Sequence, residues 1–250
     1  MRKEGRFINK VPLFFMFIIV FNACVSAEQL QVILTDKGYP PFSFDKNSPV
    51  KGIFLDLLDE VSIITGDVFV INYYPALRKR LIFANGEADI EPGVNPVWRQ
   101  KSKGVSLYSL PFGFSTDVVF FRTNERFKVE QVDDLVGKKV VTVRGYHYPD
   151  YEQAFKDNLI TRYDTNHESQ LIQFLYQSNR GADAGFINKH ILLYYMKKNN
   201  VVFDVGNIIG SVPVMFRFHL SKKASLARFN KALSQLIKNG TVDAIYKKYQ

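Results

Sequence analysis

The sequence predicts an α/β protein with two lobes joined by two crossing strands. Short apolar segments with strand propensity alternate with segments whose apolar residues recur every three or four positions, which is typical of a parallel sheet covered by helices. This alternation occurs twice, on either side of a β-prone run at 116–122, and a similar run recurs at 212–218. The chain is therefore expected to enter the second lobe through the first run and to return through the second.

The expected first lobe begins with a buried strand at 30–35, which ends in a loop because two prolines forbid a continued ladder. The other elements expected in this lobe are helix 53–65 with Gly66 as its stop, strand 68–73, helix 76–85 with apolar residues Leu77, Leu81 and Ile82, and strand 88–90. Two amphipathic helices within 224–249 are separated by Asn239-Gly240 and are expected to pack on this lobe.

The expected second lobe repeats the pattern, and a capping box of Thr165 and Glu168 is expected to begin its helix at 167. Its expected elements are strands 139–143, 160–163, 184–187 and 201–204 and helices 150–156, 167–177 and 191–197. We assign residues 28–115 and 217–250 to lobe one, 124–208 to lobe two, and 116–123 and 209–216 to the hinge crossings.

The first 27 residues read as a signal peptide. Four basic residues in the first ten positions precede the apolar run 13–21, and Val25-Ser-Ala27 provides a small-residue cleavage site. The run is well short of the ~20 residues that a membrane-spanning helix needs. The alternative is lipoprotein processing at Cys24, which fits poorly because Phe21 and Asn22 replace the usual aliphatic and small residues. We expect a periplasmic protein.

Composition and charge exclude several classes of function. The chain carries a net charge of +9, which falls to +6 without residues 1–27, and its basic residues occur as scattered pairs rather than as a stripe on one element. We therefore expect no nucleic-acid partner. The single cysteine is lost on cleavage, so no disulfide is expected. The four histidines lack metal-ligand spacing, and no nucleophile, phosphate-loop or dinucleotide motif is present, so we expect no metal, no cofactor and no catalytic residue.

The segment 86–99 is the candidate ligand loop. After a glycine helix stop and a short strand, it carries a carboxylate, an amide and a guanidinium on Glu91, Asn95 and Arg99. In an open α/β sheet, ligands bind just past the carboxyl ends of the strands, which is where these three groups are expected.

Five motifs in a fixed order resemble those of the extracellular solute-binding proteins of family 3, the periplasmic amino-acid receptors of ABC transporters. They are Thr35-Asp-Lys-Gly-Tyr-Pro-Pro-Phe42, Gly52-Ile-Phe-Leu-Asp56, Gly86-Glu-Ala-Asp89, the segment 137–145 and the segment 240–249. The resemblance covers essentially all of the mature chain. It implies a periplasmic-binding-protein-like (type II) fold, capture of a small molecule by lobe closure, a monomer, and an inner-membrane ABC permease or sensor receptor as partner.

The resemblance also implies ligand contacts in lobe one. Tyr39 falls where the family has an aromatic lid, Asp36 where members that accept basic side chains keep a carboxylate, and Arg99 where an arginine binds the α-carboxylate. Asn188 stands where the family has an aspartate for the α-amino group. An amide does not neutralise an ammonium, which puts an ordinary amino-acid ligand in question. We hypothesise that Glu91 supplies the missing charge from the opposite lobe.

In lobe two the expected contacts are Tyr146, His147 and Tyr148, where small hydroxyl residues usually meet the carboxylate. Three consecutive aromatic residues suggest a flatter or more apolar ligand. In lobe one Asn95 belongs to a shortened ligand loop, and Arg78 either points into the cleft or pairs with an acidic neighbour. Arg99 has the alternative of lying at the surface beside Trp98.

Two other functions remain as alternatives. One is a small dehydratase-like enzyme of the same fold, in which Glu91 acts as the acid. The other is an orphan sensory ligand-binding module.

Overall fold

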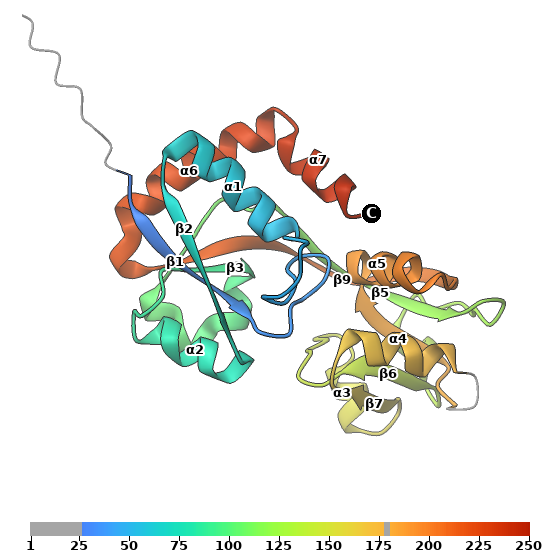
Figure 1. Cartoon of the computed structure of the whole chain (residues 1–250). Coiled ribbons are helices and arrows are strands. Elements are labelled where there is room, and N and C mark those ends of the chain that lie inside the picture. The colour runs from blue at the N-terminus through green and yellow to red at the C-terminus, as the bar shows by residue number, and fades with distance from the viewer. Residues whose placement is uncertain (1–26, 178–180) are drawn as a thin grey trace, which may run out of the picture.

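The computed structural model describes residues 27–177 and 181–250, so Cys24 and the expected signal peptide up to residue 26 lie outside the described residues. Within that part of the chain, the strands follow the order β2-β1-β3-β9-β5-β8-β6-β7, with β4 paired to β9. Helices pack on both faces of this mixed sheet, and the strands continue from one lobe into the other (Figure 1). The predicted α/β two-lobed fold is confirmed.

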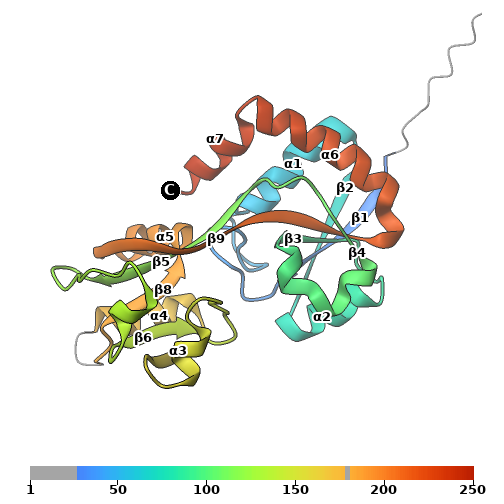
Figure 2. The same cartoon turned by 180° about the vertical axis from the view of Figure 1, so that it is seen from behind.

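Lobe one is a sheet between two helical layers, parallel from β2 to β3 and antiparallel where β9 joins β3 and β4. Strand β1 pairs in parallel with both β2 and β3, as the alternation predicted. Helices α1, α6 and α7 lie on one side and α2 on the other (Figure 2). The elements are β1 (Gln29–Thr35), α1 (Ile53–Thr65), β2 (Val68–Tyr74), α2 (Ala76–Ala84), β3 (Ile90–Val94), η1 (Pro96–Val105), β4 (Ser106–Tyr108), η4 (Leu220–Lys222), α6 (Lys223–Lys238) and α7 (Thr241–Lys248).

Helix α1 follows its sequence pattern and α2 does not. In α1 the apolar residues Phe54, Leu57, Leu58 and Val61 are buried, Ile64 in the last turn is exposed, and Gly66 closes the helix in the left-handed conformation at φ 77°. In α2 the expected buried residues Leu77 and Leu81 are 77% and 65% exposed, whereas Ile82 and Phe83 are buried. The prediction for this face was wrong because only the last turn of the helix packs on the sheet.

Strands β5 (Gly113–Arg122) and β9 (Phe203–His219) run antiparallel between the lobes. Residues 203–204 of the segment expected at 201–204 and all of the segment expected at 212–218 belong to this one 17-residue strand. The ladder between β5 and β9 contains register shifts between Asp117 and Phe120. Strand β9 also pairs with β3 and β4, so it spans both lobes.

Lobe two repeats the parallel arrangement, with β6 between β7 and β8 and β8 antiparallel to β5. The capping box expected at Thr165 and Glu168 is wrong. The N-cap of α4 is His167, without a side-chain cap, and the Glu168 carboxylate accepts a hydrogen bond from Tyr146 instead. The elements are η2 (Val132–Leu135), β6 (Lys139–Val143), α3 (Glu152–Lys156), β7 (Thr161–Thr165), α4 (Glu168–Tyr176), β8 (Ala184–Asn188) and α5 (Lys189–Asn199).

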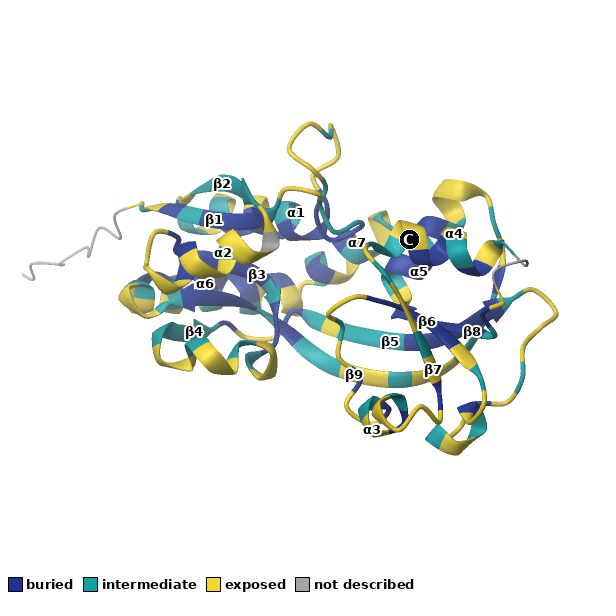
Figure 3. Ribbon diagram, turned by 90° about the horizontal axis from the view of Figure 1, so that it is seen from below, coloured by how far each residue is buried: buried dark blue, intermediate teal, exposed yellow. Residues whose placement is uncertain are grey.

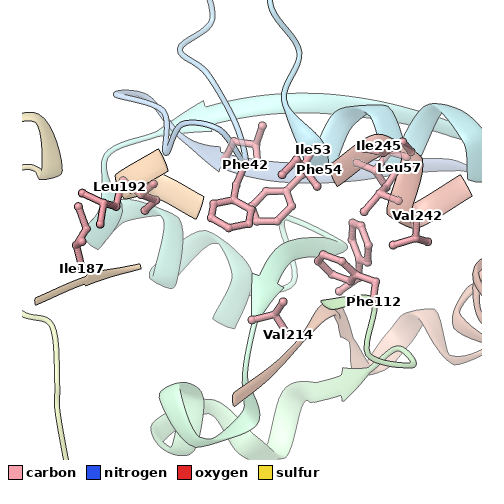
Figure 4. Close-up of a cluster of buried hydrophobic side chains, with 14 of the residues drawn as sticks. Phe42, Ile53, Phe54, Leu57, Phe112, Ile187, Leu192, Val214, Val242 and Ile245 are labelled. Carbon is pink, nitrogen blue, oxygen red and sulfur yellow. The ribbon is translucent and has the colours of Figure 1, made fainter. Parts of the chain in front are cut away.

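One apolar cluster continues through both lobes. Phe42 stacks on Phe54 at 5.4 Å, and Ile187 and Leu192 of lobe two belong to the same buried cluster (Figure 4). The buried residues lie mainly on strands and inward helix faces, and the connecting loops are exposed (Figure 3). No helix among the described residues is long and apolar enough to cross a membrane.

Candidate functional site at the junction of the lobes

Tyr39 of lobe one lies where the two lobes meet. It lies in the loop after β1, where its backbone pairs with Ser43 and its ring stacks on buried Phe42 at a centroid distance of 5.3 Å. The prolines at positions 40 and 41 keep this segment out of the sheet, as their lack of an N–H donor requires. The ring is therefore held in place from behind.

Tyr146, in the loop after β6, meets Tyr39 from lobe two. Its hydroxyl donates a hydrogen bond to the Glu168 carboxylate and also interacts with the Tyr39 hydroxyl. Burial, reinforced by the charge of Glu168, raises the pKa of both phenols, so both are neutral near pH 7. These contacts form a polar chain from lobe one to the first turn of α4.

Asp117 is the second carboxylate at this position, and the sequence analysis missed it. It lies on β5 opposite Asn188 of β8 and Gly210 of β9. Burial raises its pKa from 3.8 to about 6, and its charge acts on Tyr39 and Tyr148. Its carboxylate has no hydrogen-bond or ion-pair partner among the described side chains. We call Tyr39, Asp117, Tyr146 and Glu168 the interlobe junction. A lone acid inside the β-prone run 116–122 was the available signal.

The other expected lobe-two residues lie beside the junction. Asn188 accepts hydrogen bonds from the N–H groups of His190 and Ile191 as the N-cap of α5, and its amide donates to Ser115 Oγ at 3.2 Å. Its side chain therefore joins α5 to β5.

Tyr148 and His147 point away from one another. Tyr148 is buried against Phe186 at 5.1 Å and donates to its carbonyl oxygen at 3.3 Å. His147 is exposed, with Nδ1 3.0 Å from Oε1 of Glu152. Of the three consecutive aromatic residues, Tyr146 is the one that reaches Tyr39.

Glu91 lies in a separate, buried ion cluster. Arg99 donates to both of its oxygens, from Nε at 3.1 Å and from a terminal nitrogen at 2.7 Å. Arg217 donates at 2.9 Å and Lys79 Nζ lies at 3.2 Å. Burial opposes ionisation of Glu91, but Lys79, Arg99 and Arg217 together hold its pKa below the ordinary value. We call these four residues the Glu91 cluster.

Arg217 and Lys79 were not predicted. Arg217 stands directly opposite Glu91 in the β3–β9 ladder, and its guanidinium lies 3.8 Å from the centroid of the Phe83 ring. Its other nitrogens donate to the hydroxyls of Ser106 and Ser102, at 2.9 and 2.6 Å. An arginine within an otherwise apolar strand signalled a buried partner, but that partner is 126 residues away.

The remaining expected residues have local roles. Asn95 is buried; its oxygen accepts from the N–H of Val97, and its amide donates to the Pro213 carbonyl at 2.7 Å, which joins the ligand loop to β9. Asp36 is exposed at the start of the Tyr39 loop. Arg78 is exposed, with its guanidinium 5.6 Å from the centroid of the Tyr74 ring.

Further contacts hold the lobes together around the junction. The rings of Phe44 and Tyr194 lie 5.8 Å apart, and Lys37 Nζ lies 3.5 Å from Nε2 of His167. Lys197 donates to the Gln250 carbonyl at 2.8 Å. Across residues 27–177 and 181–250, no group of three or more acidic, histidine or cysteine residues could hold a metal ion.

Comparisons with known proteins agree on family and fold. The family model described as bacterial extracellular solute-binding proteins, family 3, matches residues 32–250. No curated protein matches the chain. The structure resembles a probable amino-acid ABC transporter extracellular-binding protein, ytmK from Bacillus subtilis, with a TM-score of 0.74 at 18% identity over 90% of this chain and 99% of that one.

Two reconstructed ancestral proteins are also similar. An ancestral arginine-binding protein bound to arginine has a TM-score of 0.70 at 23% identity, covering 88% of this chain and 97% of that one. The ancestral amino acid-binding protein AncCDT-1, a precursor of cyclohexadienyl dehydratase, has a TM-score of 0.68 at 24% identity, covering 88% and 95%. At these identities the likeness shows the fold.

Proposed function

The chain belongs to family 3 of the bacterial extracellular solute-binding proteins, and from this premise we propose that it captures a small molecule between its lobes and presents it to a membrane partner. The partner is an ABC permease or a sensor receptor. The ligand contacts we propose are Tyr39 from lobe one, Asp117 on the crossing strand, and Tyr146 and Glu168 from lobe two.

The observation that carries this proposal is the convergence of both lobes on one set of polar and aromatic side chains. A ligand that contacts Tyr39 and Tyr146 together binds the closed arrangement better than an open one, and this difference in affinity drives closure. The antiparallel pair β5 and β9 provides the connection about which the lobes move. The mechanism is capture and release of an unchanged ligand.

The family implies export of the protein. Cleavage after Ala27, a periplasmic location and a monomeric state are part of our proposal.

A ligand screen by thermal shift tests capture, with amino acids, amines and carboxylated or aromatic metabolites as probes. A ligand at about 100 times its dissociation constant adds about 2.7 kcal/mol of stability. That corresponds to a rise in Tm of about 5–10 °C for a chain of this length. Small-angle scattering with the hit should show a smaller radius of gyration.

Tyr39→Ala should weaken binding of any hit by about tenfold or more, because it removes an aromatic contact at the meeting point of the two lobes. Tyr176→Ala is the matched control, since Tyr176 is exposed at the end of α4. Equal affinities for the two variants would contradict the proposed site.

A dehydratase-like enzyme is the alternative, and Asp117 is the observation that favours it. A carboxyl group with a pKa of about 6 is suited to proton transfer near neutral pH. Glu91, the acid considered from the sequence, is held ionised by three cations. Chromatography of the hit after prolonged incubation separates the two functions, because a binding protein returns its ligand unchanged. Conversion that is lost in Asp117→Asn would favour the enzyme.

A further inference from the structure

We infer that the ligand is an organic cation, an alkylammonium or guanidinium compound without a carboxylate group. This inference rests on the proposed capture function and specifies its ligand class. The geometry that carries it is the bond of the Tyr146 hydroxyl to the Glu168 carboxylate, the unpaired Asp117 on β5, whose charge acts on Tyr39, and the two bonds that Arg99 makes to Glu91.

Both charged side chains of the interlobe junction are acidic. Asp117 is partly buried and has no ion-pair partner within the described part of the chain. The Glu168 carboxylate accepts a hydrogen bond from the Tyr146 hydroxyl. A buried carboxylate without a counter-charge is costly, and a bound cation removes that cost. The raised pKa of Asp117 has the same cause, the loss of water without a compensating partner.

Two cations beside the junction, Arg162 and Lys37, contact other groups. The Arg162 guanidinium donates to Asp164, Glu152 and the Tyr146 carbonyl oxygen. Lys37 is exposed and lies beside His167. The chain as a whole is basic, at +9, so the acidic character of the junction is a local feature.

The aromatic groups suit the same ligand. Tyr39 is fixed by its stack on Phe42, and Tyr146 by its hydrogen bond to Glu168. A cation placed against a fixed aromatic face is attracted by the negative face of the ring, and the attraction grows as the cation is desolvated. Both phenols are neutral, so they add this attraction without adding charge.

In the described part of the chain, the arginine expected to bind a ligand carboxylate is paired with Glu91. Arg99 gives Nε and one terminal nitrogen to Glu91, so the guanidinium edge that would grip a carboxylate is occupied. The amide nitrogen of Asn188, which is the donor of that side chain, donates to Ser115 Oγ at 3.2 Å. A carboxylate at the junction would face Asp117 and Glu168, and like charges repel.

Isothermal titration calorimetry with agmatine and L-arginine tests the inference, because the two molecules differ in the carboxylate alone. Putrescine and L-glutamate extend the series to a diamine and an acidic amino acid. We expect agmatine or putrescine to bind at least tenfold more tightly than L-arginine and L-glutamate.

Asp117→Asn should weaken agmatine binding about tenfold or more, as expected for loss of one charged hydrogen bond. Glu168→Gln provides a second variant with the same expectation. Asp59→Asn removes an exposed carboxylate outside the junction and should leave the affinity unchanged. Circular dichroism checks that each variant is folded.

Tighter binding of L-arginine or L-glutamate than of agmatine would overturn the inference and leave the capture function standing. Failure of agmatine and putrescine to bind below 1 mM, roughly −4 kcal/mol, would overturn it as well. If the broader metabolite screen also gave no hit, the capture function would fall with it. Unchanged agmatine affinity in both Asp117→Asn and Glu168→Gln would show that agmatine does not bind at the interlobe junction.

Discussion

Replacing Glu91 with glutamine is expected to destabilise the protein substantially. The change keeps the size of the side chain but removes the negative charge that three cations share. Arg217 is 1% exposed and cannot turn to water, whereas the side chains of Lys79 and Arg99 are 14% and 16% exposed and can relax outward. The lost stability therefore comes mainly from the uncompensated Arg217.

Breaking a buried ion pair from one side costs about 3–5 kcal/mol. Arg217 keeps its two serine hydroxyls, so we expect the lower end of that range, about 3 kcal/mol. For a chain of this length the loss corresponds to a fall in Tm of about 6–12 °C. Urea denaturation followed by circular dichroism should show a lower midpoint with an unchanged slope.

Asp59→Asn is the control for this experiment. It removes an acid from the exposed pair Lys51–Asp59, which joins two half-exposed side chains at 2.6 Å. Exposed pairs contribute about 0–1 kcal/mol. If Glu91→Gln lost no more stability than Asp59→Asn, the Glu91 cluster would not be a stabilising element and our reading of its charges would be refuted.

The pH dependence gives an independent readout of the same cluster. The folded-state pKa of Glu91 lies below its ordinary value of 4.5, so under acidic conditions the unfolded chain binds the proton more readily. The contribution of Glu91 is fully present above about pH 5 and is lost as the pH falls through the folded pKa. Urea midpoints should therefore fall more steeply below pH 4.5 in the wild type than in Glu91→Gln.

Three further changes test other parts of the structure. Asp117→Asn should stabilise the unliganded protein at pH 7 by about 1–3 kcal/mol, because the raised pKa of Asp117 makes the stability of the wild type fall as the pH rises from about 4 to 6. Urea midpoints at pH 4 and pH 7 measure this, and an equal gain in stability at both pH values would contradict it. Gly113→Ala should lose about 1–3 kcal/mol, because its Cβ would lie 2.3 Å from the Tyr246 hydroxyl oxygen; adding Tyr246→Phe should restore part of the Tm. Gly93→Ala should lose about 2–4 kcal/mol in chemical denaturation, because φ is 70° and the Cβ would meet the Phe54 ring at 2.1 Å.

The sequence predicted those parts of the fold that depend on local pattern. Helix α1 and strand β6 have the expected bounds because apolar periodicity and a glycine stop act over a few residues. The face of α2 was mispredicted because tertiary packing selects which turn is buried. The single strand β9 was missed because Gly206 and Pro213 resemble breaks when the partner strand is unknown.

The candidate site was harder to predict because its pairings are distant in sequence. From the sequence, Arg99 is interpreted as an anion-binding residue, but the structure pairs it with Glu91. Glu91 is interpreted as a free carboxylate, but the structure places Arg217 opposite it. Tyr146, His147 and Tyr148 could not all face one ligand, since successive side chains in a turn diverge. The sequence indicated which residue types form the site, but it did not indicate where each side chain points.

Strand β9 connects the Glu91 cluster to the interlobe junction and separates their charges. Arg217 on β9 holds Glu91 on β3, while Gly210 of the same strand lies opposite Asp117 on β5. Three cations, Lys79, Arg99 and Arg217, are thereby paired with Glu91, and the charged side chains of the interlobe junction are Asp117 and Glu168. The net charge of +9 therefore does not reveal the charge of the ligand that we propose, because the local pairing along β9 decides which side chains stay without a counter-charge.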